Sequence, residues 1–517
     1  MRETKRDKTM GSDKPMTRNT AVSRHVSIGI LAASVFYLLI MCIPGIISRY
    51  SYWTDELFTV AFISEDWGNM FNKWILPDVH PPLYFMIAKI WAIKFGTSEI
   101  ALRSLSLAWS LGTIVLMWNH WRCKKELRRL VFLALVISNP YFLYYSQEAR
   151  GYSMLVFFCT VVVMTTLNKS TDQQAKGINH LWFYYVAIIS ASLTHFFGFV
   201  YAFITLALDL IQARLQKNRI VTILALGIIS MWPIVHIGMI GQLGSSQINQ
   251  ITLEPQSASD VFHAFTVVGL PYLETGVNWI TTISAGILIV SLIEVFLLKK
   301  ESHSLKQINK TLNDIIYLFI VIGINLLALV IVSRLAPITT YRNLLTLMAP
   351  TSYLVASICT SILSLTQSAK SRSIRIPTLV TTTAIGFLVV VSIKVSDLNI
   401  TAKSQVTHNY RALAKTLQET NICSRGCYIT DYDPKDDGWG AQILDYYFNK
   451  YRLYHLDIDM IRNESYNFDY AMPIVGTYVN KDTLELLNNK YGYKEFQGQS
   501  TKEAKKQNEG PIILIRE

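Results

Sequence analysis

The run Val26-Ser-Ile-Gly-Ile-Leu-Ala-Ala-Ser-Val-Phe-Tyr-Leu-Leu-Ile-Met-Cys-Ile-Pro-Gly-Ile-Ile47 decides the fold class of this sequence. It contains no charged residue, and it is long enough to cross the hydrocarbon of a bilayer, which takes about 20 residues of helix. A helix of this length in a soluble core would show a polar face, and this run shows none. The run therefore predicts a membrane-spanning helix. Residues 1–25 are polar and basic, so we expect a retained signal anchor with a cytoplasmic tail.

Further apolar runs follow along most of the chain. They lie at residues 81–95, 99–121, 128–145, 152–167, 180–194, 196–212, 220–240, 277–298, 313–333, 343–365 and 376–396. Of the 517 residues, 51% are hydrophobic and only 16% are charged, whereas soluble domains are about a quarter charged. The run at 81–95 is short and carries Lys89 and Lys94, so we expect it to lie partly in the membrane interface or to be a broken pair. The sequence thus predicts an all-α polytopic membrane bundle with about 11 transmembrane helices.

The net charge of +12, from 48 lysines and arginines against 36 aspartates and glutamates, gathers in short loops between the apolar runs. Cytoplasmic loops of membrane proteins are enriched in Lys and Arg. We therefore expect these loops to be cytoplasmic: residues 123–129, 169–180, 213–219, 299–310 and 369–375. The first loop (49–79), a loop at 241–278 and the C-terminal residues 397–517 are then extracytoplasmic. There is no basic face with interleaved aromatic residues, so nucleic acid is not an expected partner.

The composition changes after residue 396. Helical stretches (residues 410–419, 439–450 and 482–490) alternate with strand-like stretches (427–430, 471–477 and 511–516), which predicts a small α/β domain. The chain is therefore expected to have three parts, namely a cytoplasmic tail (1–25), a transmembrane bundle (26–396) and an extracytoplasmic domain (397–517). Cys423 and Cys427 are candidates for a disulfide in that domain.

Polar residues gather at the predicted extracytoplasmic ends of the apolar runs, where they cost free energy unless they have a task. The groups are Asp55-Glu56, His80-Pro-Pro-Leu-Tyr84, Tyr144-Tyr-Ser-Gln-Glu148-Ala-Arg150-Gly-Tyr152, Thr194-His195 and Tyr341-Arg342-Asn343. Each group alone has an ordinary explanation: a solvated loop for the acidic pair, a helix start for His-Pro-Pro, an interfacial anchor for each arginine. Their coincidence on one side predicts a shared site. The loop at 241–278 is then either a mobile cover over that site or a passive linker.

In this order the motifs resemble those of bacterial glycosyltransferases of the C-type membrane fold, which are related to protein O-mannosyltransferases and to the lipid A aminoarabinose transferase. The resemblance covers residues 26–396. It implies an enzyme of the bacterial inner membrane that works on the extracytoplasmic face. Such an enzyme takes a sugar from a polyprenyl-phosphate donor and passes it, with inversion, to a lipid, polysaccharide or protein acceptor.

The resemblance also implies roles for the polar residues. Asp55 matches the first-loop acid that acts at the acceptor, and Glu56 accompanies it as a second catalytic candidate. The candidates for binding the donor phosphate and the substrate are His80, Tyr84, Glu148, Arg150, His195 and Arg342. The chemistry fits, because a carboxylate can take the proton of an attacking hydroxyl and a guanidinium can pair with phosphate oxygens.

This chemistry requires no cofactor, although a divalent metal is possible. Its ligands would come from Asp55, Glu56, Asp78, His80 and His195, but the spacing of a dedicated metal motif is absent from the sequence.

Two other classes of protein stay open. One is a transporter or flippase of lipid-linked saccharides, and the other is a membrane-anchored binding or assembly protein. A transporter normally buries ionisable groups near the bilayer midplane and often has repeated halves. This sequence places its charges near run ends and shows no evident repeat, which favours the enzyme.

Overall fold

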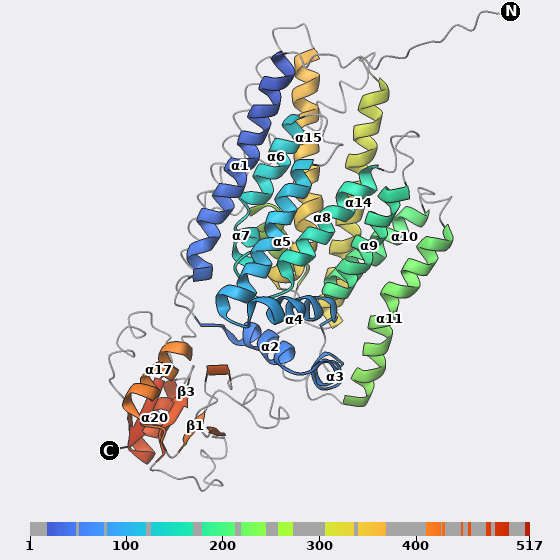
Figure 1. Cartoon of the computed structure of the whole chain (residues 1–517). Helices are drawn as coiled ribbons and strands as arrows, with labels where there is room; N and C mark the ends of the chain where they lie inside the picture. Colours follow the sequence, from blue (N-terminus) through green and yellow to red (C-terminus); the bar gives the residue numbers. More distant parts are fainter. Residues whose placement is uncertain are drawn as a thin grey trace, which may run out of the picture.

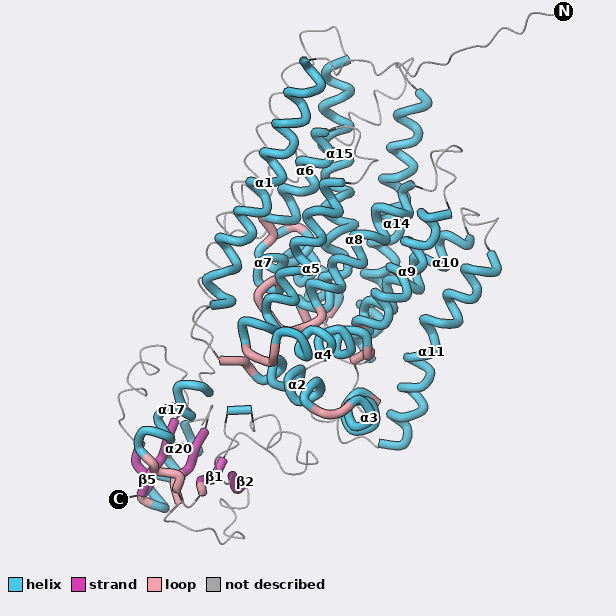
Figure 2. The backbone as a smooth tube through the Cα atoms, in the orientation of Figure 1, coloured by secondary structure: helices cyan, strands magenta, loops and turns pink. Residues whose placement is uncertain are grey.

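The computed structural model of the chain shows a bundle of helices with a smaller part, containing a sheet, at one end of it (Figure 1). Among the residues that the structure describes, strands occur only in that smaller, C-terminal part (Figure 2). The residues that the structure describes are 18–47, 51–76, 80–119, 126–168, 178–211, 219–243, 257–271, 305–335, 340–368, 410–424, 426–429, 446–447, 453–455, 472–476, 481–495 and 512–516.

The bundle consists of apolar helices of different lengths. They are α1 (Arg18–Ile47), α5 (Glu99–Asn119), α6 (Glu126–Ile137), α7 (Pro140–Tyr145), α8 (Tyr152–Asn168), α9 (Ile178–Thr194), α10 (Phe196–Ile211), α11 (Arg219–Leu243), α12 (Ala258–Gly269), α14 (Leu305–Leu335) and α15 (Met348–Ser368), the last preceded by the 3-10 helix η4 (Tyr341–Leu347). Segments long and apolar enough to cross a membrane lie at Ile28–Ile47, Glu99–Trp118, Leu312–Arg334 and Tyr341–Ser361.

Large apolar side chains point outward from the bundle. Phe36, Trp182 and Ile223 are exposed by 65%, 66% and 58%, which suits contact with lipid rather than water. The chain is therefore an integral membrane protein. The expected number of crossings stays a prediction, because the runs at 277–298 and 376–396 lie outside the described residues.

One end of the bundle carries short helices from the first loop and from the apolar run at 81–95 that follows it. They are α2 (Thr54–Ser64), α3 (Trp67–Asn69), the π-helix η1 (Met70–Ile75) and α4 (Leu83–Phe95). In Figure 1, α4 lies across the direction of the bundle, as expected for an interfacial helix. It ends at Gly96, whose φ of +82° suits glycine. Lys89 of α4 donates to the carbonyl oxygens of Ile63 (2.9 Å) and Glu65, and so joins α4 to the end of α2.

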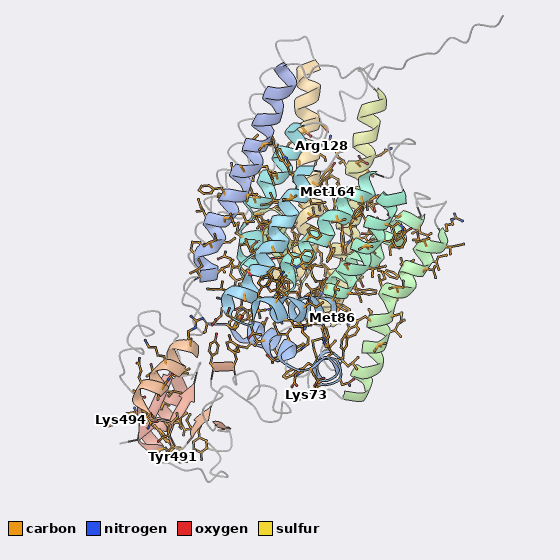
Figure 3. All side chains as sticks on the ribbon, in the orientation of Figure 1. Lys73, Met86, Arg128, Met164, Tyr491 and Lys494 are labelled. Atoms are coloured by element: carbon orange, nitrogen blue, oxygen red, sulfur yellow. The ribbon has the colours of Figure 1, made fainter. Side chains whose placement is uncertain are left out.

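The described helix ends that flank the predicted basic loops lie at one end of the bundle. Arg128, which belongs to the basic segment 123–129, lies near the end opposite to Lys73 of the first loop (Figure 3). The helices α1 and α14 begin, and α15 ends, at that same opposite end (Figure 1). The described helix ends that flank these basic loops therefore lie away from α2 and α4.

Two predictions about the bundle are wrong in detail. The run at 128–145 is interrupted, because Asn139 Oδ1 accepts from the backbone N–H groups of Tyr141 (2.9 Å) and Phe142 (3.3 Å) and so starts the new helix α7. The expected loop at 241–278 contains the helix α12, whose Val268 carbonyl accepts from Asn139 Nδ2 at 2.7 Å. Residues 244–256, where a cover or linker was considered, lie outside the described residues.

The C-terminal part contains a five-stranded sheet with the strand order β2-β1-β3-β5-β4. Its elements are α17 (Tyr410–Thr420), β1 (Cys427–Ile429), β2 (Leu453–His455), β3 (Ile474–Gly476), α20 (Lys481–Tyr491), β4 (Tyr493–Glu495) and β5 (Ile512–Arg516). β1 runs parallel to β2 and β3, whereas β5 is antiparallel to β3 and β4. The expected helices at 410–419 and 482–490 are present, but β2 and β4 were not predicted. Of the helix expected at 439–450, only Tyr446 and Tyr447 are described.

Cys423 and Cys427 lie close together at the start of β1 and are both buried free thiols. The neighbouring Cys427 thiol and burial raise the pKa of Cys423. The considered disulfide is therefore not formed in this structure. Both residues belong to an apolar core that also contains Leu413 and Leu417 of α17 and Leu102 of α5, so the C-terminal part packs against the α2–α5 end of the bundle.

The helices α9 and α10 approach each other closely at Gly198. A Cβ atom at this position would lie 2.1 Å from the carbonyl oxygen of Ala191 and 2.8 Å from Leu155 Cδ1. We expect Gly198→Ala to lower the free energy of unfolding by about 1–3 kcal/mol through overpacking. Thermal unfolding in detergent measures the effect. Gly227→Ala is the control, since no atom lies within 4 Å of its added Cβ. Equal melting temperatures for both variants would contradict this close approach.

Candidate functional site

Asp55 and Arg342 form an ion pair between segments that are far apart in the sequence. Asp55 lies in the first turn of α2, and Arg342 lies in η4. Arg342 Nη1 donates to Asp55 Oδ2 at 2.5 Å, and the two side chains are 35% and 23% exposed. The predicted meeting of these two residues is therefore present in the fold. Because neither side chain is fully buried, a polar ligand can reach the pair.

Arg150 holds the backbone of the same turn. Its Nη1 donates to the backbone carbonyl of Asp55 at 3.1 Å, and its Nη2 lies 3.2 Å from His80 Nε2. A guanidinium has only donors, so His80 Nε2 is the acceptor in this contact. Arg150 thus links α2, the segment before α4 and the turn before α8.

Glu56 faces away from Asp55, into the protein. Its carboxylate accepts from Arg103 Nε (2.9 Å), from Arg103 Nη2 (2.7 Å) and from the backbone N–H of Ala149 (2.8 Å). The side chain is 1% exposed, so both oxygens are engaged in the interior. The sequence suggested a catalytic role for Glu56, whereas this geometry is that of a positioning residue.

Arg103 was missed in the sequence, although it is the partner of Glu56. Its Nη2 also donates to the carbonyl oxygen of Ser51 at 3.0 Å. Arg103 therefore holds the chain both before the start of α2, at Ser51, and in its first turn, at Glu56. The available signal was an arginine inside an otherwise apolar run, since such a charge usually pairs within the protein.

The turn that contains Glu148 and Arg150 is held from several sides. Ser106 Oγ donates to the carbonyl of Glu148 at 2.5 Å, and Thr59 Oγ1 donates to the carbonyl of Ala149 at 3.0 Å. A Cβ on Gly151 would lie 3.2 Å from Tyr84 Cβ, so Tyr84 packs directly behind the turn. The side chains of Glu148 and Tyr84 are both buried. The structure therefore places these two residues in the interior, at the turn that carries Arg150.

A row of rings connects the remaining candidates. The ring centroids of Tyr145 and Tyr152 are 4.7 Å apart, those of Tyr152 and His195 5.6 Å, and those of His195 and His80 5.9 Å. His195 Nδ1 accepts from the N–H of Phe197 at 3.2 Å. Burial, and after it the neighbouring His80 ring and the Arg150 guanidinium, lower the pKa of His195. The His195 ring is therefore neutral at physiological pH.

The predicted residues thus form one group, in which each has its own place. Polar contacts join Asp55, Arg342, Arg150 and His80, ring contacts add His195, and Glu56, Glu148 and Tyr84 lie behind them. Within the part of the chain that the structure describes, no three His, Cys, Asp or Glu side chains are grouped to hold a metal ion. The considered ligand Asp78 lies outside the described residues.

The geometry predicts that Glu56 contributes mainly to folding. Glu56→Gln leaves the buried Arg103 without its countercharge, so we expect the free energy of unfolding to fall by about 3–5 kcal/mol. Thermal unfolding of the purified protein measures this loss. Lys73→Ala is the control, because it breaks the exposed Lys73–Glu65 pair (3.0 Å) of the same loop. That pair should contribute less than about 1 kcal/mol. Equal melting temperatures for both variants and the parent protein would show that Glu56 does not anchor this loop.

No protein-family model matches the sequence, and a search of curated proteins finds no match. Among solved structures, the fold is similar to ArnT from Cupriavidus metallidurans in the apo state, with a TM-score of 0.55, 11% sequence identity and coverage of 95% of this chain and 98% of that chain. It is also similar to the same protein bound to undecaprenyl phosphate, with a TM-score of 0.53, 11% identity and coverage of 96% and 98%. The chain therefore has the fold of ArnT, and the predicted resemblance to the C-type membrane glycosyltransferases is confirmed for the fold.

Proposed function

We propose that the chain is a membrane glycosyltransferase that moves a sugar from a polyprenyl-phosphate donor to a hydroxyl group of a lipid, polysaccharide or protein in the cell envelope. One observation carries the proposal, namely the 2.5 Å contact between Asp55 and Arg342. It brings a potential base and a potential phosphate ligand together at one end of a membrane bundle. The similar ArnT, solved with undecaprenyl phosphate bound, supports the donor class.

The site works on the extracytoplasmic face of the bacterial inner membrane in this proposal. The helix ends beside the basic loops lie at the other end of the bundle, and basic loops are normally cytoplasmic. The charged groups lie at helix ends, in the first turn of α2 and in η4, which favours an enzyme over a transporter with a midplane site.

The reaction is a single displacement at the anomeric carbon of the donor sugar. The acceptor oxygen forms a bond to this carbon while the bond from the carbon to the phosphate oxygen breaks. The phosphate oxygen keeps the electron pair, and the acceptor's proton passes to the Asp55 carboxylate. A positioned base of this kind typically raises the rate of the chemical step by about 10²–10⁴-fold. The anomeric configuration inverts, and the step requires no cofactor.

Arg342 is the proposed ligand of the donor phosphate. The phosphate gains negative charge as the sugar leaves, so an arginine beside it stabilises the transition state more than the bound donor. When the phosphate takes Arg342, the Asp55 carboxylate is released to the acceptor hydroxyl. One arginine would then couple donor binding to the availability of the base.

The other predicted residues support this pair. Arg150 acts through Asp55, because it holds the backbone carbonyl of that residue. It is therefore a positioning residue in this proposal, and it also lies close to the bound phosphate. His80 and His195 are proposed to border the bound sugar. Glu148 and Tyr84 are buried, and we propose that they shape the turn from beneath.

The base is tested by Asp55→Asn, which keeps the size of the side chain and removes its proton affinity. We expect kcat for sugar transfer in vesicles to fall by about 10²–10⁴-fold, while the melting temperature changes little. Asp66→Asn is the matched control in the same loop, since Asp66 is an exposed N-cap and asparagine caps equally well. Unchanged transfer by Asp55→Asn would exclude the proposed base.

The phosphate ligand is tested by Arg342→Ala. Loss of a hydrogen bond to a charged group should weaken binding of undecaprenyl phosphate by about ten- to a hundredfold. Titration of the purified protein in nanodiscs measures the dissociation constant. Arg219→Ala, at the exposed start of α11, is the control and should bind as the parent does. Equal affinities for both variants would remove Arg342 from the donor site.

A further inference from the structure

The carboxylate of Glu99 joins the C-terminal part of the chain to the start of α5. Glu99 begins α5, and its Oε1 accepts from the Arg411 guanidinium of α17. The same oxygen accepts from the hydroxyl of Tyr447 at 2.6 Å. The Glu99 side chain is only 12% exposed, so these contacts are sheltered from water.

Tyr447 continues the connection toward Asp55. Its hydroxyl donates to Glu99 and also accepts from the backbone N–H of Tyr52 at 2.7 Å, as a phenol hydroxyl can do both. Beside it, the hydroxyls of Tyr52 and Tyr446 both donate to the carbonyl of Thr97, at 2.9 Å and 3.1 Å. The backbone just before α2 is therefore bonded directly to the C-terminal part.

Little freedom remains between Tyr52 and Asp55. Tyr52 is fully buried, and the Arg103 guanidinium lies 5.4 Å from the centre of its ring. The same guanidinium binds the carbonyl of Ser51 and the carboxylate of Glu56, on either side of Asp55 in the chain. A displacement of Tyr52 must therefore displace the first turn of α2.

We propose that Tyr447 and Glu99 are positioning residues, through which the C-terminal part sets the place of the Asp55 carboxylate. This inference rests on the proposed function. Catalytic groups are sensitive to such placement, since a misplacement of about 1 Å can cost on the order of a hundredfold in rate. A C-terminal part that merely packed against the bundle would affect the melting temperature and leave kcat unchanged.

The decisive variant is Tyr447→Phe in the full chain, which keeps the ring and removes the bridging hydroxyl. We expect kcat for transfer to fall by roughly five- to thirtyfold, while the KM for the donor stays within about twofold. The melting temperature should stay close to that of the parent. Lys415→Ala is the matched control on α17, because its pair with Glu419 (3.6 Å) is exposed. This control should keep the parental kcat.

A double-mutant cycle separates positioning from a general loss of stability. Tyr447→Phe and Glu99→Gln remove parts of the same bonded unit, so their combined effect on kcat should be smaller than the product of the single effects. Tyr447→Phe combined with Lys415→Ala should give the simple product. A full product in both cycles would overturn the coupling of Tyr447 to Glu99.

A second readout does not depend on transfer activity. Asp55→Cys is labelled with a charged thiol reagent, in a chain where Cys123 is replaced by serine; the described cysteines are buried. We expect Tyr447→Phe to change the labelling rate several-fold and Lys415→Ala to leave it unchanged.

The outcomes distinguish the two proposals. If the parent protein transfers no sugar from any polyprenyl-phosphate donor, the proposed function fails, while a changed labelling rate still supports the positioning role. If the parent transfers sugar and Tyr447→Phe matches it in kcat and labelling rate, the positioning role is overturned and the proposed function stands.

Discussion

The buried pair between Glu56 and Arg103 is the constraint on which the rest of the site depends. It joins α2 to α5, and the same carboxylate accepts from the N–H of Ala149, so three segments meet at one group. Removing such a charge from water is costly unless its hydrogen bonds are satisfied, and here both oxygens have partners. The cost of breaking this arrangement keeps the first turn of α2 in one orientation.

That orientation explains how two adjacent acids come to have different environments. Neighbouring residues of a helix point about 100° apart, since the helix has about 3.6 residues per turn. With Glu56 fixed in the interior at 1% exposure, Asp55 must face another direction, and it reaches Arg342 with 23% of its side chain exposed. One acid is thereby a structural anchor, and the other stays accessible to chemistry. The sequence alone shows only two consecutive carboxylates.

Local patterns predicted more of this molecule than its long-range pairings. The apolar runs predicted the membrane bundle, because the length and composition of each run indicate a membrane-spanning helix independently of the other runs. The groups around Asp55, Arg150 and Arg342 could be predicted to meet because each lies at a helix end. The partners of Arg103 and Tyr447 could not be predicted, since no local pattern at either residue identifies Glu56 or Glu99 as its partner. The strands β2 (Leu-Tyr-His) and β4 (Tyr-Lys-Glu) contain polar residues and were not predicted, whereas the equally short strands β1 (Cys-Tyr-Ile) and β3 (Ile-Val-Gly) are largely apolar and were.

The three arginines of the site differ in whether a bound phosphate could replace their present partner. Arg103 binds a carboxylate that is inaccessible to solvent, and Arg150 binds a backbone carbonyl and an imidazole nitrogen. Arg342 binds a carboxylate at an accessible position, with 35% of its own side chain exposed. A phosphate can replace that carboxylate and leave the arginine paired with an anion throughout, which avoids the cost of an unpaired, partly buried charge. In the proposed function, Arg342 is therefore the arginine whose partner can change during the reaction, while the other two keep the base in place.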